Sequence, residues 1–357
     1  MQVRIVSLHR HFFEERMKQR ALVGQLGAVI TQIGFAAKKL SLEVSRAAIA
    51  GRTGSAGGAN ATGDIQKKLD VYSNDIMIEA MAGLGIVSAV ASEELDDIHV
   101  LDSTVGAPYV LVTDPLDGSS NTDNAGPVGT IWGLYEANTD NANTDKAGAA
   151  DKTAGVQKII NAEAAIEGIQ MRTPVAAGYV LYGSGTVFVY TIGDGVRGFT
   201  LDRELGEFIL THPDIRCPEK GKVYSANLAR QHEWDPKLQQ FLRALTDPKT
   251  NNIRPNAKPY SLRYSGALVN DLHRTLLEGG IFLYPGDPEN KNGKLRQVYE
   301  CAPLAFVVEH AGGRASSGSG RVLETPVTAL HQRSPLFIGS VREVELCEKF
   351  LRGEVSF

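Results

Sequence analysis

Two aspartates end an apolar strand in the first third of the chain, and this feature restricts the fold more than any other. Residues 109–114 read YVLVTD, and the residues PLDGSS follow directly. Carboxylates this close repel one another, and each raises the pKa of the other unless a cation lies between them. The fold must therefore bring a counter-charge to the end of this strand.

Three further acidic motifs lie where predicted elements begin or end. Asp64 and Asp70 flank the segment GDIQKKLD, Glu93 and Glu94 follow the apolar run IVSAVA, and Glu300 opens a predicted helix in YECAP. Side chains at the ends of elements can converge on one cleft. Oxygen ligands without a nearby His or Cys favour Mg²⁺ or Mn²⁺ over zinc. The sequence therefore predicts a carboxylate site for one of these hard cations.

The proline between the two aspartates shapes the turn. Because Pro115 prevents regular strand continuation, the turn can direct Asp114, Asp117 and the backbone carbonyl of Leu116 toward shared metal ions. Backbone N–H groups and hydroxyls that suit a phosphate oxygen come next, those of Gly118, Ser119 and Ser120. Together these features are typical of a metal-assisted phosphate-ester hydrolase, in which metal ions hold the phosphate and activate water.

Strands and helices interleave along the chain without strict βαβ regularity. Helical spacing of apolar residues covers 17–44 and the segment from Ile65 to Leu84, with Asp64 as its expected N-cap. The Gly- and Ala-rich segment 48–63 predicts a mobile loop, and the polar segment 137–170 an exposed insertion. Further strands are expected at 86–91, 128–135, 197–201, 206–211 and GIFLYP, a hairpin over AAGYVLYG and TVFVYTI, and helices at 235–246, 268–277 and 300–310. This pattern predicts a layered α+β or α/β sandwich of alternating helix and sheet layers.

Composition excludes several classes of protein. The formal net charge of −4 is unlike that of a nucleic-acid binder, which carries a basic face. No apolar run approaches the roughly 20 residues needed to cross a membrane, and the N-terminus has no apolar signal core. Cys217, Cys301 and Cys347 match no zinc or redox spacing, so we expect reduced structural thiols.

Several longer stretches carry a family resemblance. The segment DPLDGSSN resembles the signature of the magnesium-dependent, lithium-sensitive phosphatases. Inositol monophosphatases share this signature. The stretches GDIQKKLDVYSND, RYSGALVNDLHRTLLEGGIFLYP and GKLRQVYECAPLAFVVEHAGG resemble class I fructose-1,6-bisphosphatase. The similarity extends from Ala48 to Gly313, apart from the 137–170 insertion, and more loosely beyond both ends.

The resemblance implies a role for each matching residue. Asp70 and Glu94 match the pair that takes the proton from the attacking water, and Asp64 the acid by which a mobile loop closes over the metals. The implied metal ligands are Glu93, Asp114, Asp117, Glu300 and the carbonyl of Leu116. The implied groove for the sugar and its 6-phosphate consists of Asn227, Arg263, Tyr264, Tyr284 and Lys294. In the family this arginine reaches across from a neighbouring subunit, so we expect a homotetramer or dimer in which Arg263 is shared. The two expected parts are a metal-binding and regulatory half at 1–195 and a sugar-phosphate-binding half at 196–357.

The sequence also departs from the family pattern. AMP-regulated members grip the AMP phosphate with a Thr, a Lys and an Arg, and the matching positions here are Val23, Pro108 and Glu136. These three positions lack the hydroxyl and both cations that would bind the AMP phosphate, and one of them carries an anion instead. The sequence therefore predicts little or no inhibition by AMP. The 137–170 insertion contains no cysteine, which argues against the thiol switch of plastid enzymes. Arg230 stands where many members have a Tyr on the 6-phosphate, and it can hold that phosphate differently or admit a longer sugar.

The sequence thus predicts an Mg²⁺-dependent hydrolase, in which Mn²⁺ can substitute, that removes the 1-phosphate of fructose 1,6-bisphosphate. One alternative is a sedoheptulose-1,7-bisphosphatase or a dual-specificity enzyme, and another is an inactive metabolite-sensing homologue. A third is an inositol-phosphate hydrolase, but Arg263, Tyr264 and Lys294 argue against it. The expected partner is a sugar bisphosphate, with no nucleic acid and no membrane. The expected location is the cytoplasm, or the plastid stroma if a transit peptide has been removed. Gluconeogenesis and the Calvin cycle both remain open as pathways.

Overall fold

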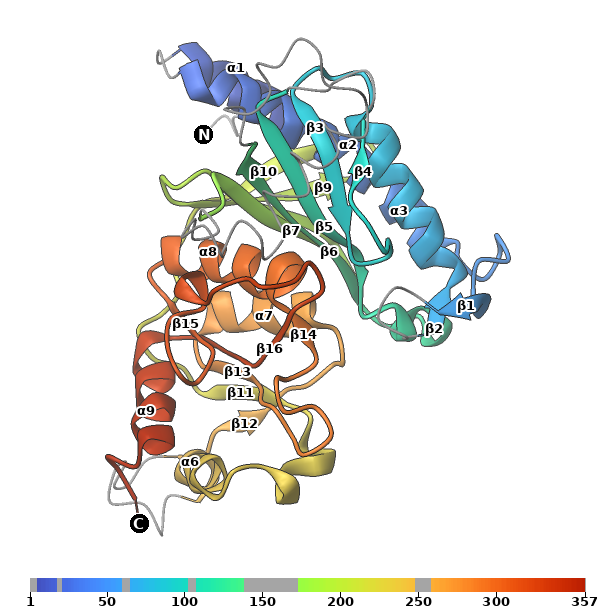
Figure 1. Ribbon diagram of the computed structural model, residues 1–357. Helices are drawn as coiled ribbons and strands as arrows, with labels where there is room; N and C mark the ends of the chain where they lie inside the picture. Colours follow the sequence, from blue (N-terminus) through green and yellow to red (C-terminus); the bar gives the residue numbers. More distant parts are fainter. Residues whose placement is uncertain are drawn as a thin grey trace, which may run out of the picture.

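The computed structural model describes residues 5–17, 21–59, 65–101, 107–137, 173–247 and 258–356. Two large sheets and three helical layers alternate through the molecule (Figure 1), and two short strand pairs complete the described elements. This arrangement confirms the predicted layered sandwich.

The larger sheet has eight strands in the order β10-β9-β8-β7-β6-β5-β3-β4. Neighbouring strands are antiparallel except β3 and β5, which run parallel. The strands are β3 (Val87–Ser92), β4 (His99–Val100), β5 (Tyr109–Asp117), β6 (Val128–Glu136), β7 (Ala176–Tyr182), β8 (Thr186–Thr191), β9 (Val196–Asp202) and β10 (Glu207–Ile215). The predicted β7–β8 hairpin is confirmed.

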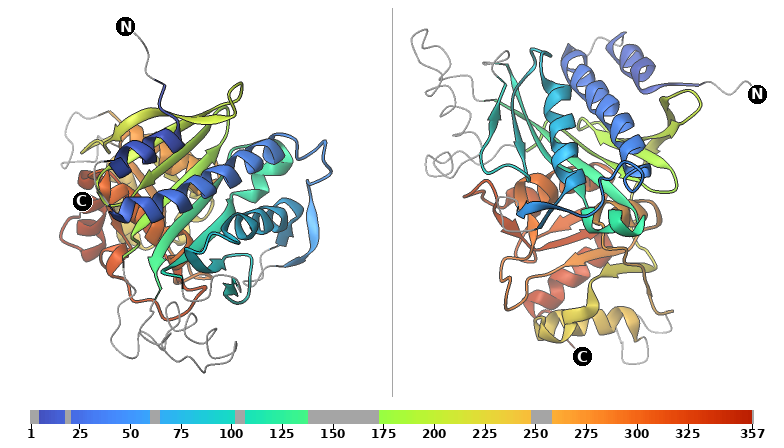
Figure 2. Two further views of the ribbon diagram at one scale, coloured as in Figure 1. Left: turned by 90° about the horizontal axis from the view of Figure 1, so that it is seen from above. Right: turned by 90° about the vertical axis from the view of Figure 1, so that its right-hand side faces the viewer.

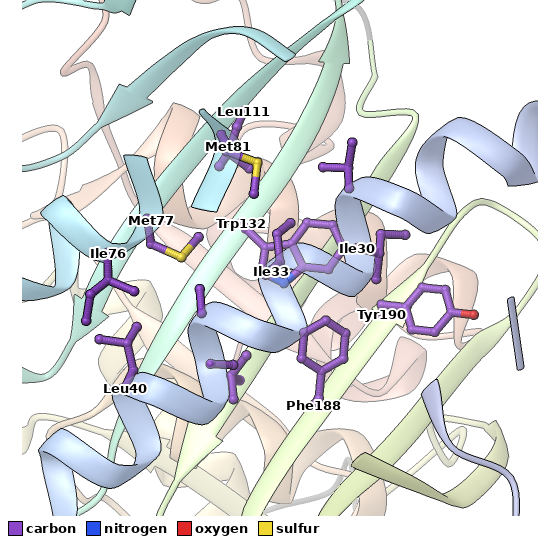
Figure 3. Packing of buried hydrophobic residues seen from close by; sticks show 14 of the residues in the cluster. Ile30, Ile33, Leu40, Ile76, Met77, Met81, Leu111, Trp132, Phe188 and Tyr190 are labelled. Atoms are coloured by element: carbon purple, nitrogen blue, oxygen red, sulfur yellow. The ribbon is translucent and has the colours of Figure 1, made fainter. Parts of the chain in front are cut away.

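Three helices cover the outer face of this sheet: α1 (Leu8–Met17), α2 (Ala21–Ser45) and α3 (Lys68–Met81) (Figure 2). The apolar residues of α2 recur every three or four positions, which gives the helix one buried face. Figure 3 shows how this face fills the first core, where side chains of α2, α3 and the sheet meet, among them Ile30, Ile33, Leu40, Ile76, Met77, Met81, Leu111, Trp132, Phe188 and Tyr190.

The smaller sheet has five strands in the order β12-β11-β13-β17-β15. Its strands are β11 (Val223–Ala226), β12 (Ser261–Leu262), β13 (Ile281–Tyr284), β15 (Arg314–Ser316) and β17 (Leu336–Gly339). Helices α7 (Leu268–Glu278) and α8 (Ala302–His310) lie between the two sheets and contact both of them. Helices α6 (Pro236–Thr246) and α9 (Val341–Arg352) cover the remaining face and enclose a separate core.

Short elements complete the described chain. They are β1 (Ser55–Ala59), β2 (Ile65–Lys67), the 3-10 helices η2 (Ser119–Asn124), η3 (Leu228–Glu233) and η5 (Val322–Glu324), the π-helical turn η4 (Gln297–Cys301), and the paired strands β14 (Leu295–Arg296) and β16 (Arg333–Ser334). The three cysteines are buried and unpaired.

The structure corrects three details of the local prediction. The 48–63 segment is not all loop, because β1 pairs with β2. Helix α3 begins at Lys68 with Lys67 as its N-cap, and not at Ile65 with Asp64 as the N-cap, since residues 65–67 form strand β2. Strand β5 continues past Pro115 to Asp117, with a register break between Asp114 and Asp117 that accommodates the proline. Asp64 and almost all of the 137–170 insertion lie outside the described residues.

The division into halves at residue 195 stays a prediction. Strands β9 and β10 pair within the eight-stranded sheet, so the strand order favours a division after Ile215. Because α7 and α8 pack on both sheets, the two parts share one middle core.

Among the described residues, no helix combines the length and the apolar character needed to cross a membrane, and this includes the 25-residue helix α2.

Candidate active site

The parallel pair β3 and β5 places the first acidic residues side by side. Ser92 of β3 lies opposite Thr113 of β5, so Glu93, directly after β3, and Asp114, within β5, lie at the same edge of the sheet. The backbone N–H of Glu93 donates to the carbonyl of Thr113 at 3.1 Å, which holds the two strand ends together. The carboxyl ends of neighbouring parallel strands are the usual place for a ligand site in a sheet of this kind.

Three buried carboxylates converge at this edge. Asp114, Asp117 and Glu300 each offer an oxygen atom, and these atoms lie within 4.8 Å of one another. Glu300 does not open a helix, as the sequence predicted, but lies in the π-helical turn η4 that precedes α8. π-Helical turns often occur at functional sites, and here the backbone N–H of Arg296 donates to Glu300 Oε2 at 2.5 Å. The structure therefore joins residues that are almost 190 positions apart in sequence.

Burial strongly disfavours the charged form of these carboxylates. Desolvation raises the pKa of Asp117 to about 7, although the backbone N–H groups of Val269 and Leu268 oppose this rise. Burial, followed by repulsion from Glu93, raises the pKa of both Asp114 and Glu300 well above the usual range. A cation at the centre of the cluster would remove both causes, since it replaces lost hydration and neutralises the repulsion.

Glu93 and Glu94 stand at the rim of the cluster. The charge of Glu93 acts on Asp114, Asp117 and Glu300. The buried guanidinium of Arg296 pairs with Glu93 at 3.5 Å from Nε to Oε1. Glu94 accepts a hydrogen bond from the Gln66 side-chain nitrogen at 2.6 Å. Carboxylates therefore outnumber cations at this site.

The chemistry of these donors fits a hard divalent cation. Asp114, Asp117 and Glu300 all offer oxygen ligands, and among the described residues this cluster contains neither His nor Cys. Leu116 is buried within the same turn, and its backbone N–H donates to Asp114 Oδ1 at 3.0 Å. This bond keeps the turn compact. The role of the Leu116 carbonyl stays a prediction.

Asp70 approaches the same site from helix α3. Its Oδ2 accepts the backbone N–H of Lys67 at 2.7 Å, and the neighbouring Ser119 side chain also lowers its pKa. Burial outweighs these effects and raises the pKa of Asp70 to about 6. Its other oxygen, Oδ1, is buried and has no hydrogen-bond partner among the described residues. Asp70 can therefore accept one more proton donor beside Ser119.

Asp117 links the two halves of the molecule. Its two oxygens accept the backbone N–H groups of Leu268 at 3.2 Å and Val269 at 2.7 Å, at the start of α7. The next residue, Gly118, has φ +74°, a conformation that L side chains rarely adopt. A Cβ atom there would lie 2.7 Å from the Cβ of Ala267. The contact between η2 and α7 therefore requires glycine.

We expect Gly118→Ala to lower the free energy of unfolding by about 3 kcal/mol, because strained backbone and overpacking add together. It should also lower kcat/KM by about tenfold or more, since Asp117 and Ser119 flank the displaced residue. Gly83→Ala is the matched control: Gly83 has φ +76° and nothing within 4 Å of the added Cβ. The prediction is wrong if urea denaturation shows equal losses for the two variants.

A second group of candidate residues lies at one edge of the smaller sheet. Strands β12, β11 and β13 are parallel neighbours, so their carboxyl ends meet at one edge. Asn227 follows β11, Tyr284 ends β13, and Arg263 and Tyr264 follow β12. The structure thus brings four of the predicted substrate residues to one edge.

Tyr264 connects this edge to the carboxylate cluster. Burial, then the proximity of Tyr284, Asp271 and Asp117, raises the pKa of the Tyr264 hydroxyl to about 12. The charge of Asp117 therefore acts on Tyr264, although one belongs to β5 and the other follows β12. Arg263 and Lys294 are both exposed, and the Arg263 Nη1 donates to its neighbour's carbonyl, that of Leu262, at 2.9 Å. Asn227 accepts the Ala229 backbone N–H at 3.2 Å.

Two residues that fix this geometry were not predicted from sequence. Buried Asp271 accepts the Ser265 backbone N–H with both oxygens, at 3.1 and 2.9 Å, and so holds the turn that carries Arg263 and Tyr264. Asn121 of η2 donates to the Ser265 carbonyl at 3.1 Å. An acidic residue on the otherwise apolar face of α7 was the one available signal for Asp271.

Comparison with known proteins adds an independent line of support. The family model described as "Fructose-1-6-bisphosphatase, N-terminal domain" matches residues 6–213, and its C-terminal counterpart matches residues 217–352. A class 1 fructose-1,6-bisphosphatase of Acaryochloris marina is 48% identical over 346 residues, which cover 97% of each chain. The chloroplastic fructose-1,6-bisphosphatase 1 of Arabidopsis thaliana is 44% identical over 92% of this chain and 76% of its own. The holo crystal structure of Leishmania major fructose-1,6-bisphosphatase matches with a TM-score of 0.84 and 38% identity, over 98% of this chain and 99% of that chain.

Proposed function

The chain belongs to the fructose-1,6-bisphosphatase family, and from this premise we propose that it hydrolyses the 1-phosphate of fructose 1,6-bisphosphate to give fructose 6-phosphate and phosphate. The observation that carries the proposal is the convergence of Asp114, Asp117 and Glu300 within 4.8 Å, near enough to Tyr264 that the charge of Asp117 raises the pKa of that tyrosine. A carboxylate cluster beside a groove with hydroxyl and cationic side chains suits a substrate with two phosphates.

We propose that Glu93, Asp114, Asp117, Glu300 and the Leu116 carbonyl hold Mg²⁺, which Mn²⁺ can replace. When bound there, Mg²⁺ would neutralise the carboxylates, hold the transferring phosphate and lower the pKa of the attacking water. The donor set supports this choice because it consists of oxygen atoms, which hard divalent cations prefer. The family and the cluster support metal dependence, and the identity of the metal is part of the proposal.

The proposed base is the pair Asp70 and Glu94. Asp70 Oδ1 is a buried acceptor with no described partner, so it can take the hydrogen bond of a water molecule. The influence of Ser119 on its pKa indicates that this carboxylate lies beside the turn at Gly118, Ser119 and Ser120, where we place the transferring phosphate. Water attacks the phosphorus and its proton passes to the base, while the bond from phosphorus to the C1 oxygen breaks and that oxygen takes up a proton from solvent water to become the C1 hydroxyl. Asp64 is proposed to close the loop over this site, and it lies outside the described residues.

The sugar and its distal phosphate are proposed to bind Asn227, Arg230, Arg263, Tyr264, Tyr284 and Lys294. The common edge of β11, β12 and β13 supports this placement. Guanidinium and ammonium groups form the strongest hydrogen bonds to phosphate, and tyrosine hydroxyls add neutral ones.

A phosphate-release assay tests the proposed function. Purified protein is given fructose 1,6-bisphosphate, sedoheptulose 1,7-bisphosphate or inositol 1-phosphate, each with Mg²⁺ and with a chelator. We expect Mg²⁺-dependent release from the fructose substrate. Release mainly from the sedoheptulose substrate would assign the alternative specificity, and no release from any substrate would favour the inactive homologue.

We also propose that AMP does not inhibit this enzyme. Glu136 of β6 lies opposite Tyr109, and its charge contributes to the raised pKa of that tyrosine. The family resemblance matches Glu136 to the arginine that grips the AMP phosphate in AMP-regulated members. Pro108 offers no ammonium group; the side chain of Val23 lies outside the described residues. In a dose-response series we expect activity to persist into the millimolar range of AMP. Half-inhibition at micromolar AMP would contradict the prediction.

A second copy of the chain is proposed to complete the molecule as a dimer or tetramer. Phe35 and Leu42 are exposed on α2 and are seven residues apart, so they share one face, and exposed Ile49 follows. An apolar face of this kind suits burial against another copy. Light scattering should show a mass of two or four chains, and Phe35→Lys with Leu42→Lys should lower it. A wild-type monomer at working concentration would contradict this prediction.

Location is proposed by analogy alone. Relatives named chloroplastic and a cyanobacterial relative support the cytoplasm or the plastid stroma, with carbon fixation as one plausible pathway beside gluconeogenesis.

A further inference from the structure

Arg230 of η3 contacts more carboxylates than it can neutralise. Its Nε lies 3.0 Å from Glu233 Oε2, and its Nη1 lies 2.7 Å from Glu289 Oε2 and 3.5 Å from Asp287 Oδ2. One guanidinium thus faces three acids, so the group is negative as a whole. A site for a phosphate dianion would not ordinarily contain such an excess of negative charge.

The three acids differ in how firmly they are held. Asp287 is only 11% exposed, and its Oδ1 accepts the backbone N–H groups of Glu289 at 2.9 Å and Asn290 at 2.7 Å. Glu233 is 29% exposed and lies on η3 together with Arg230. Glu289 is 69% exposed, although its contact with Arg230 is the shortest. Exposed ion pairs contribute little free energy, so Glu289 is the partner that a stronger anion can displace.

The position of this group relates it to the proposed sugar groove. Arg230 lies in η3, directly after Asn227 at the end of β11. Asp287 and Glu289 belong to the loop that begins after Tyr284 at the end of β13 and ends at Lys294. The charge of Lys294 acts on Glu289 and contributes to its lowered pKa. The acid group therefore joins the two segments that carry Asn227, Tyr284 and Lys294.

We propose that Glu289 is a displaceable counter-ion of Arg230, and that the distal phosphate of the sugar bisphosphate takes its place when substrate binds. The inference rests on the proposed function. A phosphate oxygen forms charge-assisted bonds with the guanidinium, while Asp287 and Glu233 continue to orient it. Glu289 thereby sets the affinity for substrates that carry a distal phosphate, and it leaves the chemical step unchanged.

Substitution of the displaceable acid tests this exchange. Glu289→Gln should lower KM for fructose 1,6-bisphosphate about twofold to fivefold, the range that an exposed ion pair is worth, with kcat within about twofold. KM for fructose 1-phosphate, which lacks the distal phosphate, should not change. Arg230→Gln should raise KM for the bisphosphate, and the double variant should equal Arg230→Gln alone, because Glu289 acts through Arg230.

The matched control is Glu324→Gln. Glu324 is also 69% exposed and pairs with an arginine, Arg321 at 3.3 Å, but it lies on η5, which packs on α8 and β15. We expect no change in KM for this variant. An unchanged or raised KM in Glu289→Gln would overturn the inference, and so would a fall in KM that persists without Arg230, since that result would indicate general charge repulsion.

Failure of this inference is distinguishable from failure of the proposed function. If wild-type protein releases no phosphate from fructose 1,6-bisphosphate, the proposed function is wrong. If the wild type is active and the KM of Glu289→Gln does not fall, the exchange alone is wrong. Thermal denaturation of each variant shows whether the fold is intact.

Discussion

Asp117→Asn should lower kcat/KM by about 10³-fold or more, since a direct ligand to a catalytic cation supplies several kcal/mol of transition-state stabilisation. The same substitution should leave the metal-free fold at least as stable as the wild type at neutral and alkaline pH. The reason is that burial raises the pKa of Asp117 to about 7, so its charged form opposes folding when no cation is bound. Activity would then be lost without unfolding.

Asp202→Asn is the control for the structural part of this effect. Like Asp117, Asp202 accepts two backbone N–H groups, those of Glu204 at 2.9 Å and Leu205 at 3.1 Å, but it lies in the β9–β10 turn. We expect near wild-type activity for it. Steady-state kinetics and thermal melts in a chelator measure both effects. A drop in kcat/KM of only a few fold for Asp117→Asn would remove Asp117 from the proposed ligands.

The metal-free protein should lose stability as pH rises from about 5 to about 8, and Mg²⁺ should reverse this loss. The pKa values of Asp114, Asp117 and Glu300 are raised by burial and mutual repulsion. Between the unfolded and folded pKa values, the folded state therefore binds more protons than the unfolded state. Stability consequently falls as pH rises through this range.

Metal affinity should show the opposite dependence. Bound Mg²⁺ requires ionised carboxylates, so binding releases the protons that burial retains, and affinity should rise at least about tenfold between about pH 6 and about pH 8. Thermal melts with and without Mg²⁺ measure the first effect, and calorimetry in two buffers of different ionisation enthalpy counts the protons. Asp117→Asn should release about one proton fewer. A metal-free melting temperature that rises between about pH 5 and about pH 8 would contradict the assignment of this cluster.

Much of the fold was predictable because local patterns follow the periods of strand and helix. Strand β5, predicted to end at Asp114 and observed to end at Asp117, and the hairpin of β7 and β8 were predicted close to their observed bounds. The elements that were predicted wrongly are those whose conformation depends on pairing or packing with other parts of the chain. Strand β1 is rich in Gly and Ala and exists through its pairing with β2, and the π-helical turn at Glu300 depends on packing around the cluster.

The site shows the same division. Acidic residues at the ends of apolar runs were a strong local signal, and the resemblance assigned roles to them. The roles of Asp271 and Asn121 were not predicted, because each residue forms a hydrogen bond to the backbone of Ser265, and no sequence motif indicates such a contact. The acidic contacts of Arg230 could not be predicted from sequence either. Glu233 and Glu289 have the pattern of ordinary surface charges, and they meet Arg230 only because the fold pairs β11 with β13.

The sequence by itself determined the chemistry: oxygen ligands at strand ends, a glycine after the second aspartate, and apolar periods that specify alternating layers. Those features depend on residue type and near-neighbour spacing, which the chain carries directly. Only the tertiary structure decided which carboxylates lie close together, how strongly burial raises their pKa values, and which acids surround Arg230. Desolvation and repulsion depend on distances between residues that lie far apart along the chain, and these distances exist only once the two sheets have packed against α7 and α8.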